Sequence, residues 1–322
     1  MYFNQKNSFY HGVMFHHFHD NKKHIKSQGS INKSMLIKLI NFIGRKNIID
    51  ADEFLKKFQR NELKKNHVCL TFDDSLKCQF DIAKPVLDKF NIKAFFFVYT
   101  ASLENELNYI EIFRYFRSKF YKNINIFYKD FFSYLEKKYS KAKVDNFFKK
   151  NRYERIKWKK KFKFYSNQDI NFRLIRNKFF SDKDYLKIML GLIKEKGLDI
   201  SKLKNKFNLN KKEILRLHKS GHLIGLHTHS HPFQLNKLNY SIQKREYQIN
   251  KKILEKITKT KILSVAHPCG SYNKNTLKIL NSLGVEIGFK QIMTKESFMK
   301  KINNSKFEIA REDHSKIVSK LK

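Results

Sequence analysis

Residues 67–74 read HVCLTFDD, an apolar run that ends in two adjacent carboxylates, Asp73 and Asp74. Short apolar runs with β-branched and aromatic residues are typical of buried strands. Two further strands are predicted nearby, at Phe9–Phe18 and Lys93–Val98. Apolar residues recur every three to four positions, as in helices, at Ser34–Ile43 and Cys78–Phe90. The first third of the sequence is therefore predicted to alternate strands with helices.

The last third repeats this pattern. Its predicted helices are Lys211–Ser220, Ile242–Ile257 and Thr276–Leu283, and its predicted strands are His222–His227, Ile262–Ala266, Val285–Phe289 and Phe307–Ala310. Strand–helix units of this length predict parallel strands with helices packed outside, either as a barrel or as a doubly wound sheet. In both folds the functional residues gather at the carboxyl ends of the strands.

Residues 105–210 differ in composition from both flanks. The segment from residue 111 to residue 210 contains 28 Lys and Arg residues but only 10 Asp and Glu residues, and its aromatic residues are interleaved with the basic ones. This pattern predicts helices with aromatic inner faces and basic outer faces. It fits either an insertion with a small core of its own or a lid or docking surface for an anionic ligand. We therefore divide the chain into 1–104, a helical basic insertion at 105–210, and 211–322.

The composition limits the class of protein. With 41% hydrophobic and 15% aromatic residues in a chain of 322, there is enough apolar material for a packed core, which excludes wholesale disorder. The longest apolar run, Ala94–Tyr99, is far shorter than the roughly 20 residues of a membrane span. Met1–Asn7 lack the order of a signal peptide, and the three cysteines suit a reducing compartment. We therefore expect a cytoplasmic protein.

The net charge of +39, from 68 Lys and Arg against 29 Asp and Glu, attracts nucleic acid, anionic membrane surfaces or acidic glycans. A compositional explanation is also available, because Lys, Asn, Ile and Phe, which have AT-rich codons, are all abundant. No zinc-finger, RNA-recognition or KH-type motif accompanies the charge. Specific nucleic-acid binding is therefore not expected.

Asp73 and Asp74 stand where a predicted buried strand meets a loop. Two adjacent carboxylates in such a place repel each other and lose hydration, so they need a partner. A divalent cation would supply one. The alternative is a pair of loop acids, one of which caps the helix that follows.

A histidine cluster, HTHSHP at residues 227–232, follows the predicted strand His222–His227. His227 and His231 are four residues apart, so on a brief helical turn both imidazoles lie on one side, where they can share a metal ion. Two histidines and one carboxylate leave a coordination position open, which is the arrangement of catalytic zinc. The alternative is a solvated cluster, and His229 is expected to have a structural role.

Together, TFDD at 71–74 and HTHSHP at 227–232 resemble motifs of the polysaccharide deacetylase family, also called the NodB homology domain or carbohydrate esterase family 4. The likeness extends over residues 70–98 and 221–289 and includes AHPCGSYN at 266–273. It implies an α/β fold, a distorted (β/α) barrel of about seven strands, with the basic helical segment inserted between the third and fourth strands.

At the matching positions, the resemblance implies a role for each residue. Asp73 would be the general base that deprotonates the attacking water. Asp74, His227 and His231 would bind a divalent metal ion, usually Zn²⁺ in this family. The backbone N–H of Cys269 would help to hold the oxyanion. These roles meet the needs of amide hydrolysis, which are an activated water, charge stabilisation on the carbonyl oxygen and an acid for the leaving amine.

The general acid and the residue that orients the base do not stand at their usual family positions in this sequence. The family's Leu-x-His strand near the C-terminus is missing, but VMFH at 13–16 resembles the first strand of a permuted branch of the family. His16 is therefore predicted to be the general acid. The arginine usual in the third motif is also missing, and Arg311, after the predicted strand Phe307–Ala310, is the candidate to orient Asp73.

Three further positions depart from the family pattern. Ser75 stands where a glycine is usual and is expected to tighten the loop, while His267 and Cys269 replace aromatic residues common in the third motif. Asp313 and His314, close behind the candidate arginine, are expected to lie at the surface.

The resemblance implies a metal-dependent hydrolase that removes an N-acetyl group from a sugar of a cell-surface polysaccharide or of its lipid- or nucleotide-linked precursor. The expected partner is an acetylated aminosugar glycan or precursor. The expected place is the cytoplasm, peripheral to the inner membrane face, because a basic insertion attracts phosphate and anionic lipid. Two alternatives stay open: a catalytically impaired, deacetylase-like glycan-binding protein, and a basic nucleic-acid-binding protein.

Overall fold

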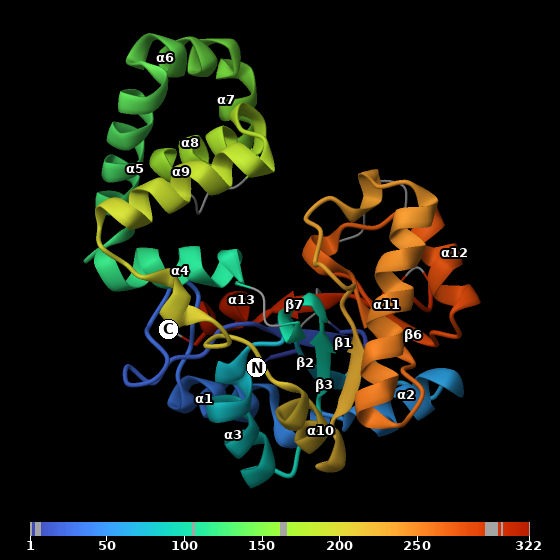
Figure 1. Ribbon diagram of the computed structural model, residues 1–322. Coiled ribbons are helices and arrows are strands. Elements are labelled where there is room, and N and C mark those ends of the chain that lie inside the picture. Colours follow the sequence, from blue (N-terminus) through green and yellow to red (C-terminus); the bar gives the residue numbers. More distant parts are fainter. Residues whose placement is uncertain are drawn as a thin grey trace. The chain divides into compact units, whose positions relative to one another are not determined.

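The computed structural model describes residues 2–3, 8–104, 107–161, 166–293, 302–303 and 305–321 (Figure 1). The chain divides into two compact units. One unit, here called the barrel unit, consists of Met1–Leu107 and Lys204–Lys322, and the other, the helical unit, consists of Asn108–Leu203. In chain order the helical unit lies between the third and fourth strands. The predicted insertion, residues 105–210, contains this unit.

Within the described residues, the barrel unit has seven strands that pair in parallel, in the order β6-β5-β4-β3-β2-β1-β7. Their bounds are β1 His11–Phe15, β2 Val68–Phe72, β3 Phe95–Val98, β4 Leu223–Leu226, β5 Ser264–Ala266, β6 Ile287–Phe289 and β7 Arg311–Asp313. All parallel strands in such a sheet end at the same edge. The loops that follow β1, β2, β4 and β5 therefore converge.

The two ends of the sheet are joined by residues just before β7. Phe289 of β6 forms a parallel bridge with Ile309, and the N–H of Gly12 in β1 donates to the carbonyl of Ala310 at 3.0 Å. The barrel is therefore nearly closed. Our prediction of a strand at Phe307–Ala310 was wrong in position, because this segment crosses from β6 to β1 and the ladder with β1 begins at Arg311.

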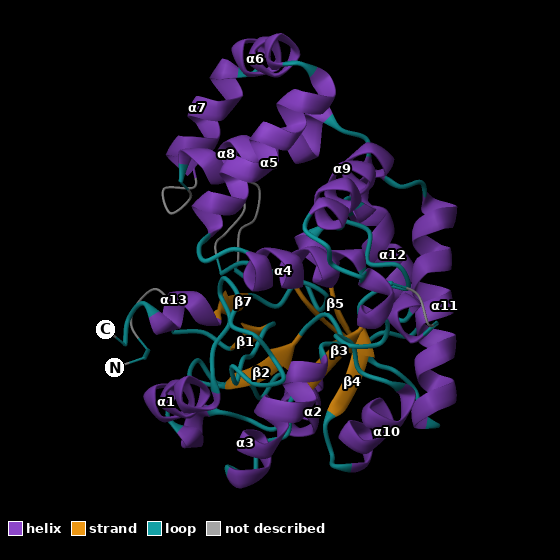
Figure 2. Ribbon diagram, turned by 60° about the vertical axis from the view of Figure 1, so that its left-hand side comes forward, coloured by secondary structure: helices purple, strands orange, loops and turns teal. Residues whose placement is uncertain are grey.

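Helices surround the strands of the barrel unit (Figure 2). Their bounds are α1 Lys33–Ile43, α2 Ala51–Gln59, α3 Lys84–Lys89, α10 Lys211–Lys219, α11 Tyr240–Thr258, α12 Lys274–Ser282 and α13 His314–Val318. Side chains of Asn32, Asn210, Asn239 and Asn273 cap the N-termini of four of them. The predicted helix at Cys78–Phe90 is a π-helical turn, Gln79–Ala83, followed by α3.

Aromatic side chains fill the inside of the barrel. Phe289 of β6 lies 5.1 Å and 5.6 Å, ring centre to ring centre, from Phe95 and Phe97 of β3, although β4 and β5 separate these strands in the sheet. A Cβ atom on Gly225 of β4 would lie 2.5 Å from the Phe97 ring. Glycine at this position therefore makes room for the interior phenylalanine. Phe54 of α2 packs against the same cluster.

The helical unit has a core of its own. Its helices are α4 Tyr109–Phe120, α5 Ile124–Tyr139, α6 Lys141–Lys150, α7 Arg152–Lys161, α8 Asn167–Leu174 and α9 Asp182–Glu195. Fully buried Phe116, Phe127, Phe131 and Phe172 form the centre of this core, while most basic residues of α6 and α7 are exposed. Among the helices of the described residues, none has both the length and the apolar character needed to cross a membrane.

Candidate metal and catalytic site

The polar residues singled out by sequence lie at the carboxyl ends of the strands. Asp73 and Asp74 follow β2 directly, His227 follows β4, and His16 follows β1. Residues 16, 73 and 227 each stand one place beyond a buried strand, so the strands fix where these residues leave the sheet. The sheet topology brings together residues that are far apart in the sequence.

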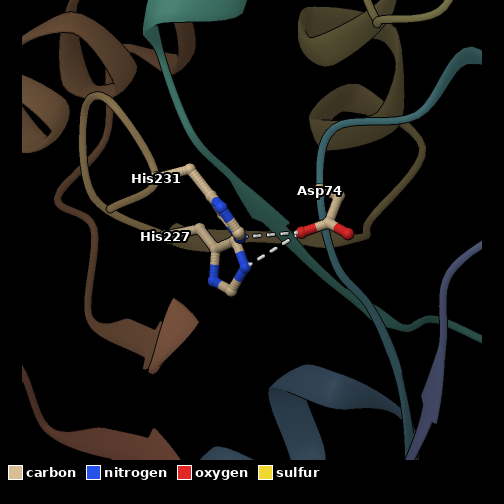
Figure 3. A group of neighbouring side chains, drawn as sticks. All are labelled: Asp74, His227 and His231. Atoms are coloured by element: carbon tan, nitrogen blue, oxygen red, sulfur yellow. Dashed lines mark hydrogen bonds and ion pairs between the residues drawn. The ribbon is translucent and has the colours of Figure 1, made fainter. Parts of the chain in front are cut away.

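Asp74, His227 and His231 form a compact group (Figure 3). The Oδ1 atom of Asp74 lies 3.2 Å from Nε2 of His227 and 3.2 Å from Nε2 of His231, and the three ligand atoms all lie within 4.8 Å of one another. The ligands of a four-coordinate zinc ion, each about 2.0–2.1 Å from the metal, are roughly 3.3 Å apart. The spacing in this group therefore fits a bound divalent cation.

The orientation of His227 gives a second reason for a cation at this place. Its Nδ1–H donates to the carbonyl of Ala266 at 2.8 Å, so in the neutral ring Nε2 carries a lone pair. That lone pair faces a carboxylate oxygen of Asp74, which also has only lone pairs to offer. Two acceptors 3.2 Å apart need either a cation between them or a proton on Nε2, which would make His227 a donor to Asp74. A carbonyl holding the outer ring nitrogen is the usual partner of a metal-binding histidine.

Burial would by itself raise the pKa of the Asp74 carboxyl. The hydrogen bonds from His227 and His231 oppose burial and hold that pKa well below its usual value. Asp74 is therefore an anion at neutral pH, as a metal ligand must be.

The loop that carries Asp74 has an unusual backbone. Asp74 and Ser75 both have positive φ, 74° and 56°, a conformation that favours glycine. The hydroxyl of Ser75 donates to the carbonyl of Tyr99 at 3.2 Å and accepts from its N–H at 3.0 Å. The serine at the family's glycine position therefore ties this loop to the end of β3.

Asp73 is almost fully buried and is paired with Arg311. The Nη1 atom of Arg311 donates to Oδ1 of Asp73 at 2.7 Å and to the hydroxyl of Thr71 at 3.2 Å, while Nε donates to the carbonyl of Lys290 at 2.9 Å. Burial would raise the pKa of Asp73, but the charge of Arg311 holds it below its usual value. A Cβ on Gly12 would lie 3.0 Å from Cγ of Arg311, so this glycine leaves room for the arginine.

His16 lies between the two carboxylates. Its Nε2 atom is 4.0 Å from Oδ2 of Asp73 and 3.9 Å from Oδ2 of Asp74. Both distances are too long for direct hydrogen bonds. The side chain is 25% exposed. The side-chain amide of Gln79 donates to the backbone carbonyls of both His16 and Asp73, at 3.0 Å and 2.6 Å. This amide therefore fixes the two segments relative to each other.

Cys269 lies in the single turn Pro268–Gly270, one residue after the end of β5, with a φ of 53°. Its side chain is exposed. Its neighbour His267 is buried, and Nε2 of His267 bonds to the carbonyl of Phe307 at 2.9 Å. Burial lowers the pKa of His267 to about 4, so this histidine is neutral and serves the packing of the turn.

The remaining histidines near the motifs are placed by structural contacts. Nδ1 of His229 lies 3.0 Å from the hydroxyl of Thr100, and His229 does not belong to the group of Asp74, His227 and His231. His314 is buried, contrary to our expectation, because its ring stacks on Phe15 and bonds to the carbonyls of Met14 and Gly29. The prediction rested on the polar residues next to His314 in the sequence, and these give no sign of its contact with the apolar strand β1.

The sequence analysis missed several residues that support the site, among them Gln79 and two residues of α11. Glu246 and Asn250 of α11 bond to the backbone of the loop that carries the histidines. The available signal was a polar residue within the buried stripe of a predicted amphipathic helix, since Asn250 lies between buried Tyr247 and Leu254.

Comparison with known proteins agrees with this geometry. Residues 189–288 match a family model described as polysaccharide deacetylase. Over this segment the chain is similar to the polysaccharide deacetylases. The match confirms the predicted resemblance to this family in the segment that carries the histidine motif. The matched range includes His227 and His231, and Asp73 and Asp74 lie outside it. No curated protein sequence matches the chain.

Solved structures of deacetylases share the fold. The PplD deacetylase of Streptococcus pyogenes, in complex with acetate, is 16% identical with a TM-score of 0.51, and the match covers 97% of both chains. IcaB from Ammonifex degensii is 14% identical with a TM-score of 0.55, over 95% of this chain and 91% of that one. A de-N-acetylase from Aggregatibacter actinomycetemcomitans is 11% identical with a TM-score of 0.54, over 94% and 93%. Likeness at these identities establishes the fold, a nearly closed (β/α) barrel.

Proposed function

We propose that this polysaccharide deacetylase relative is a metal-dependent hydrolase that removes an N-acetyl group from a sugar of a cell-surface polysaccharide or of its lipid- or nucleotide-linked precursor. The observation that carries the proposal is the convergence of Asp74, His227 and His231 beside a buried, arginine-paired Asp73. The family match and the barrel fold support the same class of reaction.

Asp74, His227 and His231 would hold the cation. Two imidazoles and one carboxylate, with room for a further ligand, are a donor set of catalytic zinc sites, so Zn²⁺ is the proposed ion. A divalent cation held there supplies Lewis acidity, which lowers the pKa of water and polarises the acetyl carbonyl.

Asp73 is the proposed general base. Arg311 occupies its Oδ1 atom, and Oδ2 is the oxygen that faces His16. Because the pKa of Asp73 lies below its usual value, the carboxylate is ionised at neutral pH and ready to take a proton from the attacking water. Arg311 keeps this carboxylate in one orientation throughout.

His16 is the proposed general acid. As the C–N bond of the amide breaks, its Nε2 atom gives a proton to the departing amine, and acetate carries away the oxygen of the attacking water. The position of His16 between the two carboxylates supports this role. The backbone N–H of Cys269, in the turn after β5, is the proposed donor to the oxyanion.

The proposed place of action is the cytoplasmic side of an anionic membrane. The support is the charge of the helical unit, where α7 carries exposed Arg152, Arg155, Lys157, Lys159 and Lys160. Clusters of basic residues are attracted to anionic lipid and to the phosphates of lipid- or nucleotide-linked sugars.

The test combines metal analysis with acetate release from oligomers of an N-acetylated aminosugar. We expect the purified protein to contain one equivalent of zinc and to release acetate, and we expect Asp74→Ala and His231→Ala to lose both properties. His218→Ala, which removes a histidine of α10, should keep both. Unchanged metal content in the two ligand variants would overturn the proposed centre.

A further inference from the structure

The loop His227–His231 has a strained backbone. Thr228 and His231 both have positive φ, 64° and 56°, although neither is glycine. β-Branched and bulky residues rarely adopt this conformation without help from their surroundings. Both metal-ligand candidates of this loop depend on that backbone for their direction, so something must hold it.

Glu246 of α11 holds the middle of the loop. Its Oε2 atom accepts hydrogen bonds from the N–H groups of His229 and Ser230, at 2.9 Å and 2.8 Å, and its Oε1 atom accepts from the hydroxyl of Ser230 at 2.8 Å. A carboxylate has only acceptor atoms, which match three donors in one short segment. The loop residues between the two ligands are therefore tied to one side chain.

Asn250, one helical turn further along α11, holds the start of the loop. Its Oδ1 atom accepts from the N–H of His227 at 3.0 Å, while Nδ2 donates to the carbonyl of Val98 at 2.9 Å and to the hydroxyl of Thr100 at 3.3 Å. The side chain is fully buried. It therefore joins the ends of β3 and β4 and sets where the first histidine leaves the strand.

We propose that Glu246 and Asn250 are positioning residues that hold the His227–His231 loop in its metal-binding shape. This inference rests on the proposed function, because it assumes that the loop binds a metal ion. Neither side chain contacts the three ligand atoms. Glu246 and Asn250 act on the two histidines through backbone N–H groups of the loop. Replacing either residue should therefore let the histidine side chains occupy a wider range of positions and weaken metal binding, although both histidines are still present.

The same helix supplies a matched control. Gln243 is as fully buried as Asn250, and its amide donates to the carbonyl of Leu238 and accepts from the hydroxyl of Thr276. It does not bond to the histidine loop in these contacts. Gln243→Ala therefore removes a buried amide from α11 without removing a tie to the loop.

The experiment measures the affinity of the metal-free protein for Zn²⁺ by competition with a chelator, and the visible absorption of its Co²⁺ complex. We expect Glu246→Ala and Asn250→Ala to bind Zn²⁺ about 10- to 100-fold more weakly than the unchanged protein, as is typical when an outer partner of a ligand is removed. Their Co²⁺ spectra should shift, because the coordination geometry relaxes. Glu246→Gln should restore most of the affinity, since its amide oxygen still accepts from the two N–H groups.

The outcomes separate this inference from the proposed function. Gln243→Ala should melt at a lower temperature yet bind Zn²⁺ as the unchanged protein does. If Glu246→Ala and Asn250→Ala also bind Zn²⁺ unchanged, or if Gln243→Ala loses as much affinity as they do, the positioning role is wrong while the metal centre stands. If the unchanged protein binds no Zn²⁺, the proposed function fails, and this inference fails with it.

Discussion

Arg311 and Asp73 are joined by a 2.7 Å hydrogen bond across 238 residues of sequence, and both side chains are buried. This contact connects the first residue of β7 with the residue that follows β2. A buried carboxylate next to a guanidinium stays ionised, while a buried carboxylate without one takes up a proton. The arginine therefore sets both the direction and the protonation of the proposed base.

Arg311→Met should raise the pKa of Asp73 and reduce deacetylation. Without the guanidinium, burial dominates and the carboxyl is protonated at higher pH. The acidic limb of the pH–rate profile should move to higher pH, and the maximal rate should fall by about 10²-fold or more, within the usual range for loss of a general base. The measurement is kcat for acetate release against pH, and Arg311→Lys should give a smaller shift.

A stability measurement completes this test. Leaving a buried charge without its partner costs roughly 3–5 kcal/mol, so Arg311→Met should lower the free energy of unfolding by about that amount. The double variant Arg311→Met with Asp73→Asn removes both charges and should regain much of the stability while staying inactive. A pH profile of Arg311→Met that matches the unchanged enzyme would show that the arginine does not control the base.

His16→Ala should slow the hydrolysis of amides far more than that of activated esters. A general acid contributes about 10²–10⁴-fold when the leaving group is a poor one, and an amine must be protonated as it departs. An aryl acetate has a leaving group that needs little help, so its hydrolysis should change by less than about 10-fold. The measurement is kcat/KM for both substrates, with zinc content as the control. Equal losses for both would indicate that His16 does not act as the acid.

Much of the barrel could be predicted from sequence because its signals are local. The run Phe95–Val98 is apolar on both faces, as a strand covered on both sides must be, and Asp73 and Asp74 end such a run. His227 and His231 were found for the same reason, since their spacing is visible in six residues. Arg311 was chosen because the family's usual arginine is missing and a late arginine of related sequences matches this position, and in the structure it donates to Asp73.

Features that depend on distant contacts could not be predicted. α2 was missed because only Ala51, Phe54 and Leu55 of its nine residues are buried, which is too short a stripe for a periodicity signal. The roles of Glu246 and Asn250 appear only once α11 is packed beside the loop after β4. A carboxylate on a helix that accepts from a loop looks, in sequence, like any solvated glutamate.

The stability of the protein should fall as the pH is lowered from about 6.5 to 4. Burial lowers the pKa of His222 and of His267 to about 4 from the usual 6.5. Between these values the unfolded chain binds protons that the folded chain does not, so the free energy of unfolding decreases with decreasing pH, by about 1.4 kcal/mol per pH unit for each group. The measurement is urea unfolding at a series of pH values.

A single substitution isolates one of these groups. Nδ1 of His222 accepts from the N–H of Ala94 at 3.1 Å, and the amide oxygen of an asparagine can accept the same bond. His222→Asn should therefore fold. Between about pH 6.5 and 4 its free energy of unfolding should change less steeply with pH, by the contribution of one titrating group, about 1.4 kcal/mol per pH unit. A slope identical to that of the unchanged protein would mean that His222 is protonated equally in both states.

Charge reversal on α7 should strongly weaken association with anionic membranes. Lys157, Lys159 and Lys160 are exposed, and each basic residue near an anionic surface contributes about 1 kcal/mol, so three reversals to Glu should weaken binding by roughly 100-fold or more. The measurement is co-sedimentation with vesicles containing an anionic lipid, at low and at physiological salt. The control changes the net charge equally on the barrel unit, at exposed Lys252, Lys256 and Lys261. If both triple variants lose binding to the same degree, the attraction comes from the overall charge of the chain, and α7 is no specific docking surface.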